Sequence, residues 1–215
     1  MAKKDRTGNR KTREQKKKIK VPELGYYLIV TDTEATERCY FEGLHKSLPE
    51  EVKNKLTIKV VETKTRTMID KCQELTAYDA QYRIPWIVFD RDQVKDFDEI
   101  IAEAERKGIS VGWSNPCFEI WMYAYFGQMP AIQESWRCCS DFGRVYENKT
   151  SQVYSKADEQ IYARLCACGD EEKALEIAEQ KFEQCKREDK NIPSEMYPCT
   201  TVYELVGEIT SKKGQ

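Results

Sequence analysis

Four short apolar runs alternate with amphipathic segments over residues 26–126. The runs lie at 26–31, 56–62, 85–90 and 109–114, and the first of them is a continuous apolar run. This pattern is typical of strands buried on both faces of a sheet. The segments between them place apolar residues at helical spacing, over about 37–48, 67–80 and 97–107. Because parallel neighbouring strands need crossover helices, the pattern predicts an α/β fold with a parallel sheet of about four strands.

Local signals predict where two of the helices begin. Thr33 or Thr36 is placed to cap the first helix. Asn115 is placed to cap a later helix with Pro116 at its first position. That helix runs through residues 118–126 and is apolar on nearly all sides, so we expect it to be buried.

The segment after residue 127 has a different pattern. It shows turn signals around Pro130, Gly143 and Pro193 and helical patterns near 155–167, 171–190 and 200–211, with no strand of comparable strength. We therefore expect three parts: a basic arm without a fixed structure at 1–24, an α/β core at 25–127, and an α-helical extension packed on the core at 128–215.

The net charge of −2 over 215 residues hides an uneven distribution. Residues 1–20 carry ten Lys and Arg, among them Lys16, Lys17 and Lys18, against two acidic residues, a balance of +8 that leaves −10 on the remaining 195 residues. Such an arm can release counterions from a nucleic-acid backbone. It can equally serve as a solubilising tail, and the sequence leaves both readings open.

Other features narrow the class of protein. We expect a cytoplasmic protein without a membrane segment, because the chain has no run of about 18 apolar residues and no signal-peptide pattern near residue 1. The nine cysteines include no CxxC pair, so we interpret them as buried reduced thiols and not as zinc ligands. His45 is the single histidine. Catalysis by a Ser-His or Cys-His pair is therefore disfavoured, and carboxylates are the remaining candidates for catalytic groups.

Acidic residues follow three of the apolar runs. Asp32 follows the first, Glu62 ends the second, and Asp90 and Asp92 end the third as Asp-x-Asp. If the first and third strands are neighbours, Asp32, Asp90 and Asp92 converge at the edge where open parallel sheets bind ligands. Carboxylates there can bind Mg²⁺, which keeps several waters for a phosphate substrate. The alternative is structural, because Asp90 and Asp92 also suit the start of the following helix.

Several segments together resemble the RloB family, which is similar to the AbiLii-type abortive-infection proteins. The resemblance runs from about residue 26 to 209 and is most specific in one segment, WSNPCFEIW at 113–121. The other segments are YYLIVTDTEATERCYFEGL at 26–44, IVFDRDQ at 87–93, YENK at 146–149 and PCTTVYELVGEI at 198–209.

The resemblance implies a Toprim-like core, in which an acidic residue after the first strand and an Asp-x-Asp after the third hold Mg²⁺ or Mn²⁺ for phosphodiester chemistry. It further implies a nuclease in phage defence that acts with a partner ATPase, on RNA such as tRNA more than on DNA. The resemblance does not determine whether the protein forms a homo-oligomer. The Toprim pattern usually has Glu-Gly where this chain has Asp32-Thr33. Glu34 or Glu37 can therefore replace Asp32, or the chain can be inactive.

Further candidates come from the same segments. Glu62 and Glu119 are secondary acidic candidates, and we expect Glu119 either to face the acidic site or to meet a cation such as Arg91 or Lys149. The candidates for phosphate contact are Lys64, Arg66, Arg91 and Lys149, each of which can instead be a solvated surface charge.

Two other functions stay open. The first is a non-catalytic subunit that docks on an ATPase and binds nucleic acid through residues 1–20, which the Asp32-Thr33 departure favours. The second is a phosphatase of the haloacid dehalogenase type, because WIVFDRDQV fits a hydrophobic run followed by Asp-x-Asp-x-Val. In that enzyme Asp90 would be the nucleophile and Asp92 the general acid.

Overall fold

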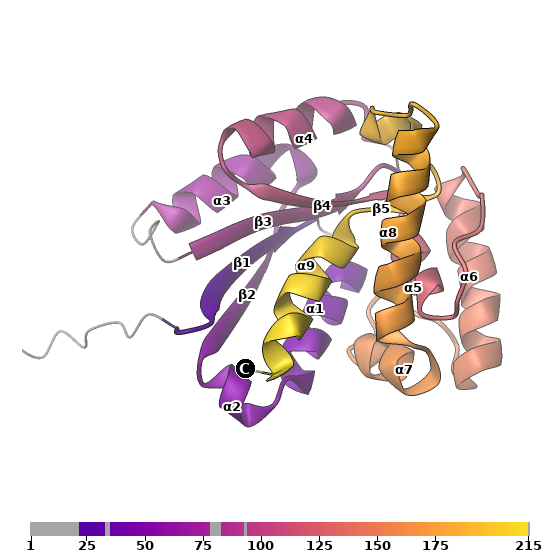
Figure 1. Cartoon of the computed structure of the whole chain (residues 1–215), viewed down its shortest axis with the longest axis horizontal. Helices are drawn as coiled ribbons and strands as arrows, with labels where there is room; N and C mark the ends of the chain where they lie inside the picture. The colour runs from indigo at the N-terminus through magenta and orange to yellow at the C-terminus, as the bar shows by residue number, and fades with distance from the viewer. Residues whose placement is uncertain (1–21, 33–34, 78–82, 93, 215) are drawn as a thin grey trace, which may run out of the picture.

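The computed structural model describes residues 22–32, 35–77, 83–92 and 94–214, and its centre is a five-stranded sheet (Figure 1). The strand order is β2-β1-β3-β4-β5, and the first four of these strands are parallel. Their bounds are Gly25–Thr31 for β1, Leu56–Glu62 for β2, Arg83–Asp90 for β3 and Ser110–Asn115 for β4. The predicted α/β fold with four parallel strands is confirmed, and β1 and β3 are neighbours.

The fifth strand was not predicted. β5, Cys199–Thr200, pairs antiparallel with the end of β4. Beyond this pairing, threonine side chains continue along the edge of β4: Thr201 Oγ1 accepts from the Trp113 amide at 3.0 Å and donates to the Val111 carbonyl at 3.0 Å. A strand of two residues has no periodicity to read, so the sequence pattern gives no sign of it.

The sheet is covered by helices on both faces. Leu28 and Val30 of β1 belong to a buried cluster with α3, Met68–Thr76, and α4, Phe97–Arg106. Tyr27 and Ile29 belong to a second cluster on the opposite face, with α1, Ala35–Ser47, and α5, Glu119–Ala124. Neighbouring residues of a strand point to opposite faces, so the continuous apolar run is explained by burial on both sides.

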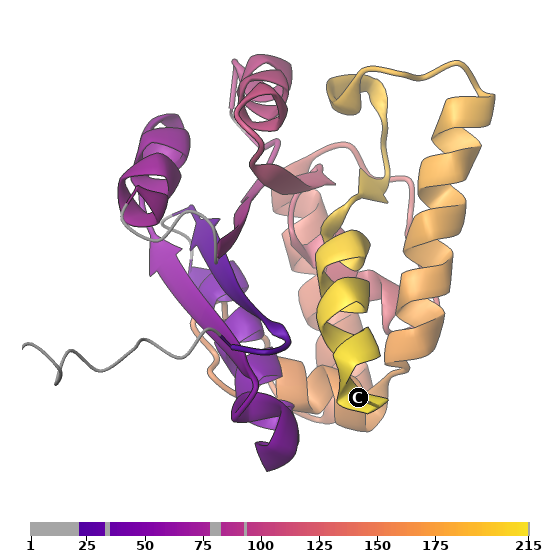
Figure 2. The same cartoon turned by 60° about the vertical axis from the view of Figure 1, so that its left-hand side comes forward.

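The segment after residue 127 is helical, as predicted, but its elements differ in detail. It forms α6 at Ser135–Thr150, α7 at Ile161–Cys168, α8 at Glu171–Arg187 and α9 at Val202–Thr210. Gly143, expected in a loop, lies inside α6. The helix expected from residue 155 begins only at Ile161. Figure 2 shows α9 on the opposite side of the sheet from α3 and α4, and its buried residues complete the cluster that contains α1 and α5.

Two predicted caps are wrong. Thr36 is the second residue of α1, where it is buried, and Thr33 lies outside the described residues. Asn115 is the last residue of β4, and α5 has Phe118 at its N-cap. The Asn115 amide nitrogen instead donates to the carbonyls of Pro193 and Ser194, at 3.1 and 3.2 Å. A partner almost eighty residues away cannot be read from a local capping pattern.

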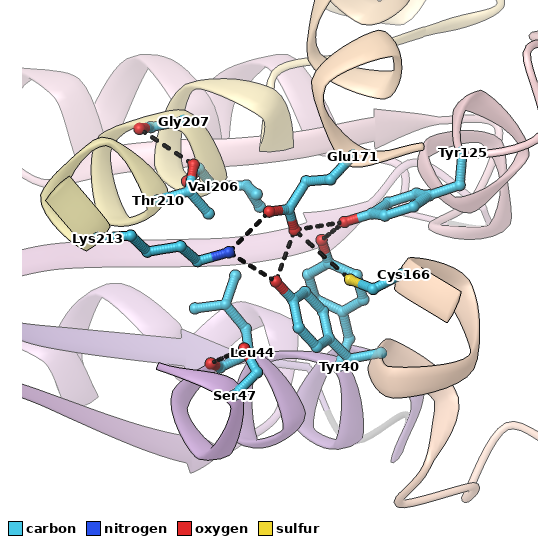
Figure 3. A network of polar contacts seen from close by, with 11 residues as sticks. Tyr40, Leu44, Ser47, Tyr125, Cys166, Glu171, Val206, Gly207, Thr210 and Lys213 are labelled. Atoms are coloured by element: carbon cyan, nitrogen blue, oxygen red, sulfur yellow. Dashed lines mark hydrogen bonds and ion pairs between the residues drawn. The ribbon is translucent and has the colours of Figure 1, made fainter. Parts of the chain in front are cut away.

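Polar contacts join the C-terminal helices to α1 and α5 (Figure 3). The Glu171 carboxylate accepts from the hydroxyls of Tyr125 and Tyr162 and from the Lys213 ammonium. The Tyr125 hydroxyl in turn lies 2.6 Å from that of Tyr40 in α1. Five segments therefore share one network of polar side chains.

Two further predictions are tested by the described residues. No helix among them is both long and apolar enough to cross a bilayer. All nine cysteines are free thiols. Six of these are buried as expected, whereas Cys139 is partly exposed and Cys166 and Cys168 are exposed on α7, so burial was wrong for those three.

Candidate active site

The carboxyl ends of β1 and β3 lie side by side. In the register of this pair Thr31 is opposite Val88, so that Asp32 directly follows β1 and Asp90 closes β3 at the same edge of the sheet. The Thr65 hydroxyl, from the loop after β2, donates a hydrogen bond to the Asp32 carboxylate. Asp32 and Asp90 are half-buried. The topology thus brings these two carboxylates to the edge where ligands bind in open α/β sheets.

Asp92 is placed by the backbone of the next strand. The Arg91 amide donates to the Ser114 carbonyl at 2.9 Å, and the Asp92 amide donates to the Pro116 carbonyl at 3.0 Å. Because of these two hydrogen bonds, the chain that follows β3 runs beside the end of β4. The Asp92 side chain is exposed and lines a cleft of about 370 Å³.

The three aspartates do not form a tight cluster. A metal ion can be shared by three Cys, His, Asp or Glu side chains whose ligand atoms lie within 4.8 Å of one another. Among the described residues, Cys117, Glu119 and Cys139 meet this criterion. The side chains of Asp32, Asp90 and Asp92 lie at the same edge of the sheet, but they do not meet this distance criterion.

Basic side chains border this edge. The cleft beside Asp92 is also lined by Arg91 and Lys95. A second cleft, of about 560 Å³, shares Lys95 and is lined by Lys64 and Arg66. Arg66 makes a long contact of 4.0 Å with Asp96, and its side chain remains 84% exposed. Lys95 was not among the predicted residues, because a single surface lysine gives no sequence signal of its own.

Two of the secondary acidic candidates lie in β2 and in α1. Glu62 ends β2 and forms an ion pair with Arg38 Nε at 3.1 Å, while Arg38 Nη1 lies 3.3 Å from Glu42. Glu37 is buried in α1 with 2% of its surface exposed. Glu62 is therefore engaged in linking β2 to α1.

Glu119 does not meet either predicted cation. It is 1% exposed, and its Oε1 accepts a hydrogen bond of 2.7 Å from the Tyr154 hydroxyl. Lys149 is exposed in the last turn of α6. Since a helix rises 1.5 Å per residue, Lys149 lies roughly 21 Å along α6 from Ser135, whose hydroxyl donates to the Pro116 carbonyl. The structure does not bring Lys149 to the basic clefts.

Some candidates lie outside the described residues. These are Glu34, which precedes α1 in the sequence, and the arm residues Lys16, Lys17 and Lys18. Their roles stay predictions.

The comparisons with known proteins agree with the resemblance noted in the sequence. A family model described as RloB-like protein matches residues 27–209. No curated protein and no solved structure matches the chain. The matched region spans the sheet except for the first two residues of β1, and it includes every described helix from α1 to α8 and nearly all of α9. The chain therefore belongs to the RloB-like protein family.

Proposed function

We propose that this RloB-like protein is a Mg²⁺-dependent nuclease of phage defence. The observation that carries the proposal is the pairing of β1 with β3, which brings Asp32 and the Asp90-Arg91-Asp92 segment to one edge of the sheet. Two clefts border the same edge, and each is lined in part by basic side chains. Carboxylates for a metal ion and cations for phosphates thus stand next to each other.

The donor set fits a hard cation. All three candidate ligands are carboxylates, and Mg²⁺ is usually bound through one or two carboxylates while it keeps several waters. An open arrangement of Asp32, Asp90 and Asp92 is compatible with this preference. The Thr65 hydroxyl donates a hydrogen bond to one carboxylate oxygen of Asp32, which orients this carboxylate. When bound, the ion polarises a phosphoryl oxygen and lowers the pKa of a bound water, which suits a site without histidine.

In this proposal the basic residues bind the nucleic-acid backbone and not the metal ion. Lys64, Arg66 and Lys95 line one cleft, and Arg91 lines the other with Lys95. Such side chains position a nucleic-acid backbone without reading its sequence. We take structured RNA, such as a tRNA, as the first substrate to test and DNA as the second. A partner ATPase is the expected companion.

A second candidate function is a non-catalytic subunit that docks on an ATPase. It is favoured by the Asp32-Thr33 departure and by the spacing of the three aspartates, which are not gathered within 4.8 Å in the described structure. This function predicts nucleic-acid binding without cleavage.

The decisive experiment compares cleavage and metal binding. Purified protein, alone and with a co-expressed partner ATPase, is incubated with RNA and DNA in Mg²⁺, Mn²⁺ or EDTA. We expect metal-dependent cleavage that is lost in Asp90→Asn and Asp92→Asn. Asp141→Asn is the matched control, because Asp141 lies on α6 in ion pairs with Arg137 and Arg144. Absence of cleavage in every condition, with no Mg²⁺ or Mn²⁺ binding by calorimetry, would support the docking subunit.

A further inference from the structure

Two thiols and a carboxylate converge beneath the end of β4. Cys117 follows the strand, Glu119 is the first residue of α5, and Cys139 lies on α6. Their ligand atoms all lie within 4.8 Å of one another. Cys117 and Glu119 are 2% and 1% exposed, while Cys139 is partly exposed. The cluster is thus enclosed by protein except on the side of Cys139.

The spacing of the two sulfurs matches a shared metal ion. The Sγ atoms of Cys117 and Cys139 are 3.8 Å apart. Two thiolates bound at about 2.3 Å in tetrahedral geometry around Zn²⁺ are separated by about 3.8 Å. A disulfide would require about 2.0 Å. The sulfurs therefore already stand at the separation that a zinc ion requires.

The electrostatics of the cluster also favour a cation. Glu119 makes no ion pair with any residue that the structure describes, although it is buried. Burial of several acidic groups together is unfavourable because their charged forms repel one another. A divalent cation would compensate that repulsion.

A second residue supports the carboxylate. The Tyr154 hydroxyl donates to Glu119 Oε1 at 2.7 Å. Outer groups of this kind orient the carboxylate ligands of metal sites. Tyr154 itself packs against Phe142 of α6, with ring centroids 5.0 Å apart, so its position is fixed by the core.

We propose that Cys117, Glu119 and Cys139 form a binding site for Zn²⁺, distinct from the aspartates at the ends of β1 and β3. The two thiolates and one carboxylate oxygen supply three ligands, and a water on the side of Cys139 supplies the fourth. Thiolate ligands select zinc over Mg²⁺, which prefers oxygen. Binding ties α6 to the segment after β4 and releases the two thiol protons.

Cobalt spectroscopy tests the site directly. Reduced protein is titrated with Co²⁺ in the absence of oxygen. We expect one equivalent to give a thiolate-to-cobalt charge-transfer band with the visible bands of tetrahedral cobalt, both abolished by added Zn²⁺ and unaffected by excess Mg²⁺. Cys117→Ser and Cys139→Ser should lose the charge-transfer band, and Tyr154→Phe should weaken affinity by roughly 10- to 100-fold. Cys168→Ser, which alters an exposed thiol on α7, is the matched control.

A measurement on the unaltered chain covers the case in which a variant fails to fold. Zn²⁺ should slow alkylation of Cys139, followed by mass spectrometry, and leave Cys168 unchanged. Equal alkylation rates with and without Zn²⁺, or a thiolate band that persists in Cys139→Ser, would overturn the site. Asp90→Asn and Asp92→Asn should keep the cobalt spectrum, so loss of the proposed nuclease activity and loss of this site are separate results.

Discussion

The Tyr162 hydroxyl donates a hydrogen bond of 2.6 Å to Oε2 of Glu171, which joins α7 to the first residue of α8 (Figure 3). The same oxygen accepts from Tyr125 at 3.1 Å, while Oε1 lies 2.9 Å from Lys213 Nζ. One carboxylate therefore satisfies the polar ends of two buried tyrosines and balances a lysine from the C-terminal segment. The stability of the helical half depends on it.

Loss of this acceptor should destabilise the fold. Glu171→Ala leaves the hydroxyls of Tyr125 and Tyr162 without their acceptor, which costs about 2–3 kcal/mol of unfolding free energy. Urea denaturation checks the value. Glu172→Ala, one residue along on the exposed side of α8, should change stability by less than about 0.5 kcal/mol. Equal effects of the two substitutions would contradict the role given to Glu171.

A pair of glycines offers a test of helix packing. A Cβ on Gly43 of α1 would lie 2.7 Å from Tyr162 Cβ, closer than carbon atoms approach, so Gly43→Ala should destabilise by about 1–3 kcal/mol. A Cβ on Gly207 of α9 would lie 3.6 Å from Leu175 Cδ2, an ordinary contact. Gly207→Ala should be neutral or stabilise by up to about 1 kcal/mol through helix propensity. Thermal melts of the two variants should therefore shift in different directions or by clearly different amounts.

Alkaline pH should weaken the fold through Cys72. This thiol is fully buried between α3 and the sheet, and burial raises its pKa from 9.0 to about 11. Between these values the unfolded chain loses the proton while the folded chain keeps it. Stability is complete below about pH 9 and falls by up to about 1.4 kcal/mol per pH unit as pH rises towards 11.

The contribution of Cys72 can be isolated from that of other groups. Unfolding free energies are measured from pH 8 to 11 for the unaltered chain and for Cys72→Ala, which starts less stable because of the cavity. The variant should show the shallower pH dependence above pH 9. The same comparison with Cys168→Ala, an exposed thiol, should show no change in slope.

The basic clefts predict a salt dependence of nucleic-acid binding. Each lysine that contacts a phosphate of a duplex releases condensed counterions, so Lys64→Ala and Lys95→Ala should each reduce the slope of log affinity against log salt by about 0.9. Fluorescence anisotropy with a labelled RNA duplex measures this slope. Lys53→Ala is the control, because Lys53 lies in α2, Glu50–Lys53, before the amino end of β2, where it pairs with Glu50. An unchanged slope in both cleft variants would place phosphate contacts elsewhere.

The fold could be predicted wherever the sequence of a single segment is enough to indicate its secondary structure. The central strand β1 is buried on both faces, and its continuous apolar run reflects that burial directly. The helices α1, α3 and α4 repeat apolar residues at helical spacing and were found within a few residues of their ends. β5 and the role of Asn115 were missed, since each depends on a partner more than seventy residues away.

The same distinction applies to the sites. Asp32 and Asp90 could be assigned to one edge because strand ends in a parallel sheet share a direction. The two residues come close together only if β1 and β3 are neighbouring strands. The sequence pattern does not determine the strand order, so this had to be assumed. Cys117, Glu119 and Cys139 come from three elements and contain no CxxC pair, so no local spacing reveals them. Lys95 likewise becomes a candidate only when two clefts are seen to share it.

The position of β5 in the chain also has a consequence for synthesis on the ribosome. The edge of β4 is completed by residues 199–201, and the cluster that contains α1 and α5 is completed by α9. During translation, β1 to β4 therefore emerge long before the segment that pairs with the edge of β4. Such an unpaired edge can associate with other chains. Until residues 199–209 have left the exit tunnel, the edge of β4 therefore stays open to such association.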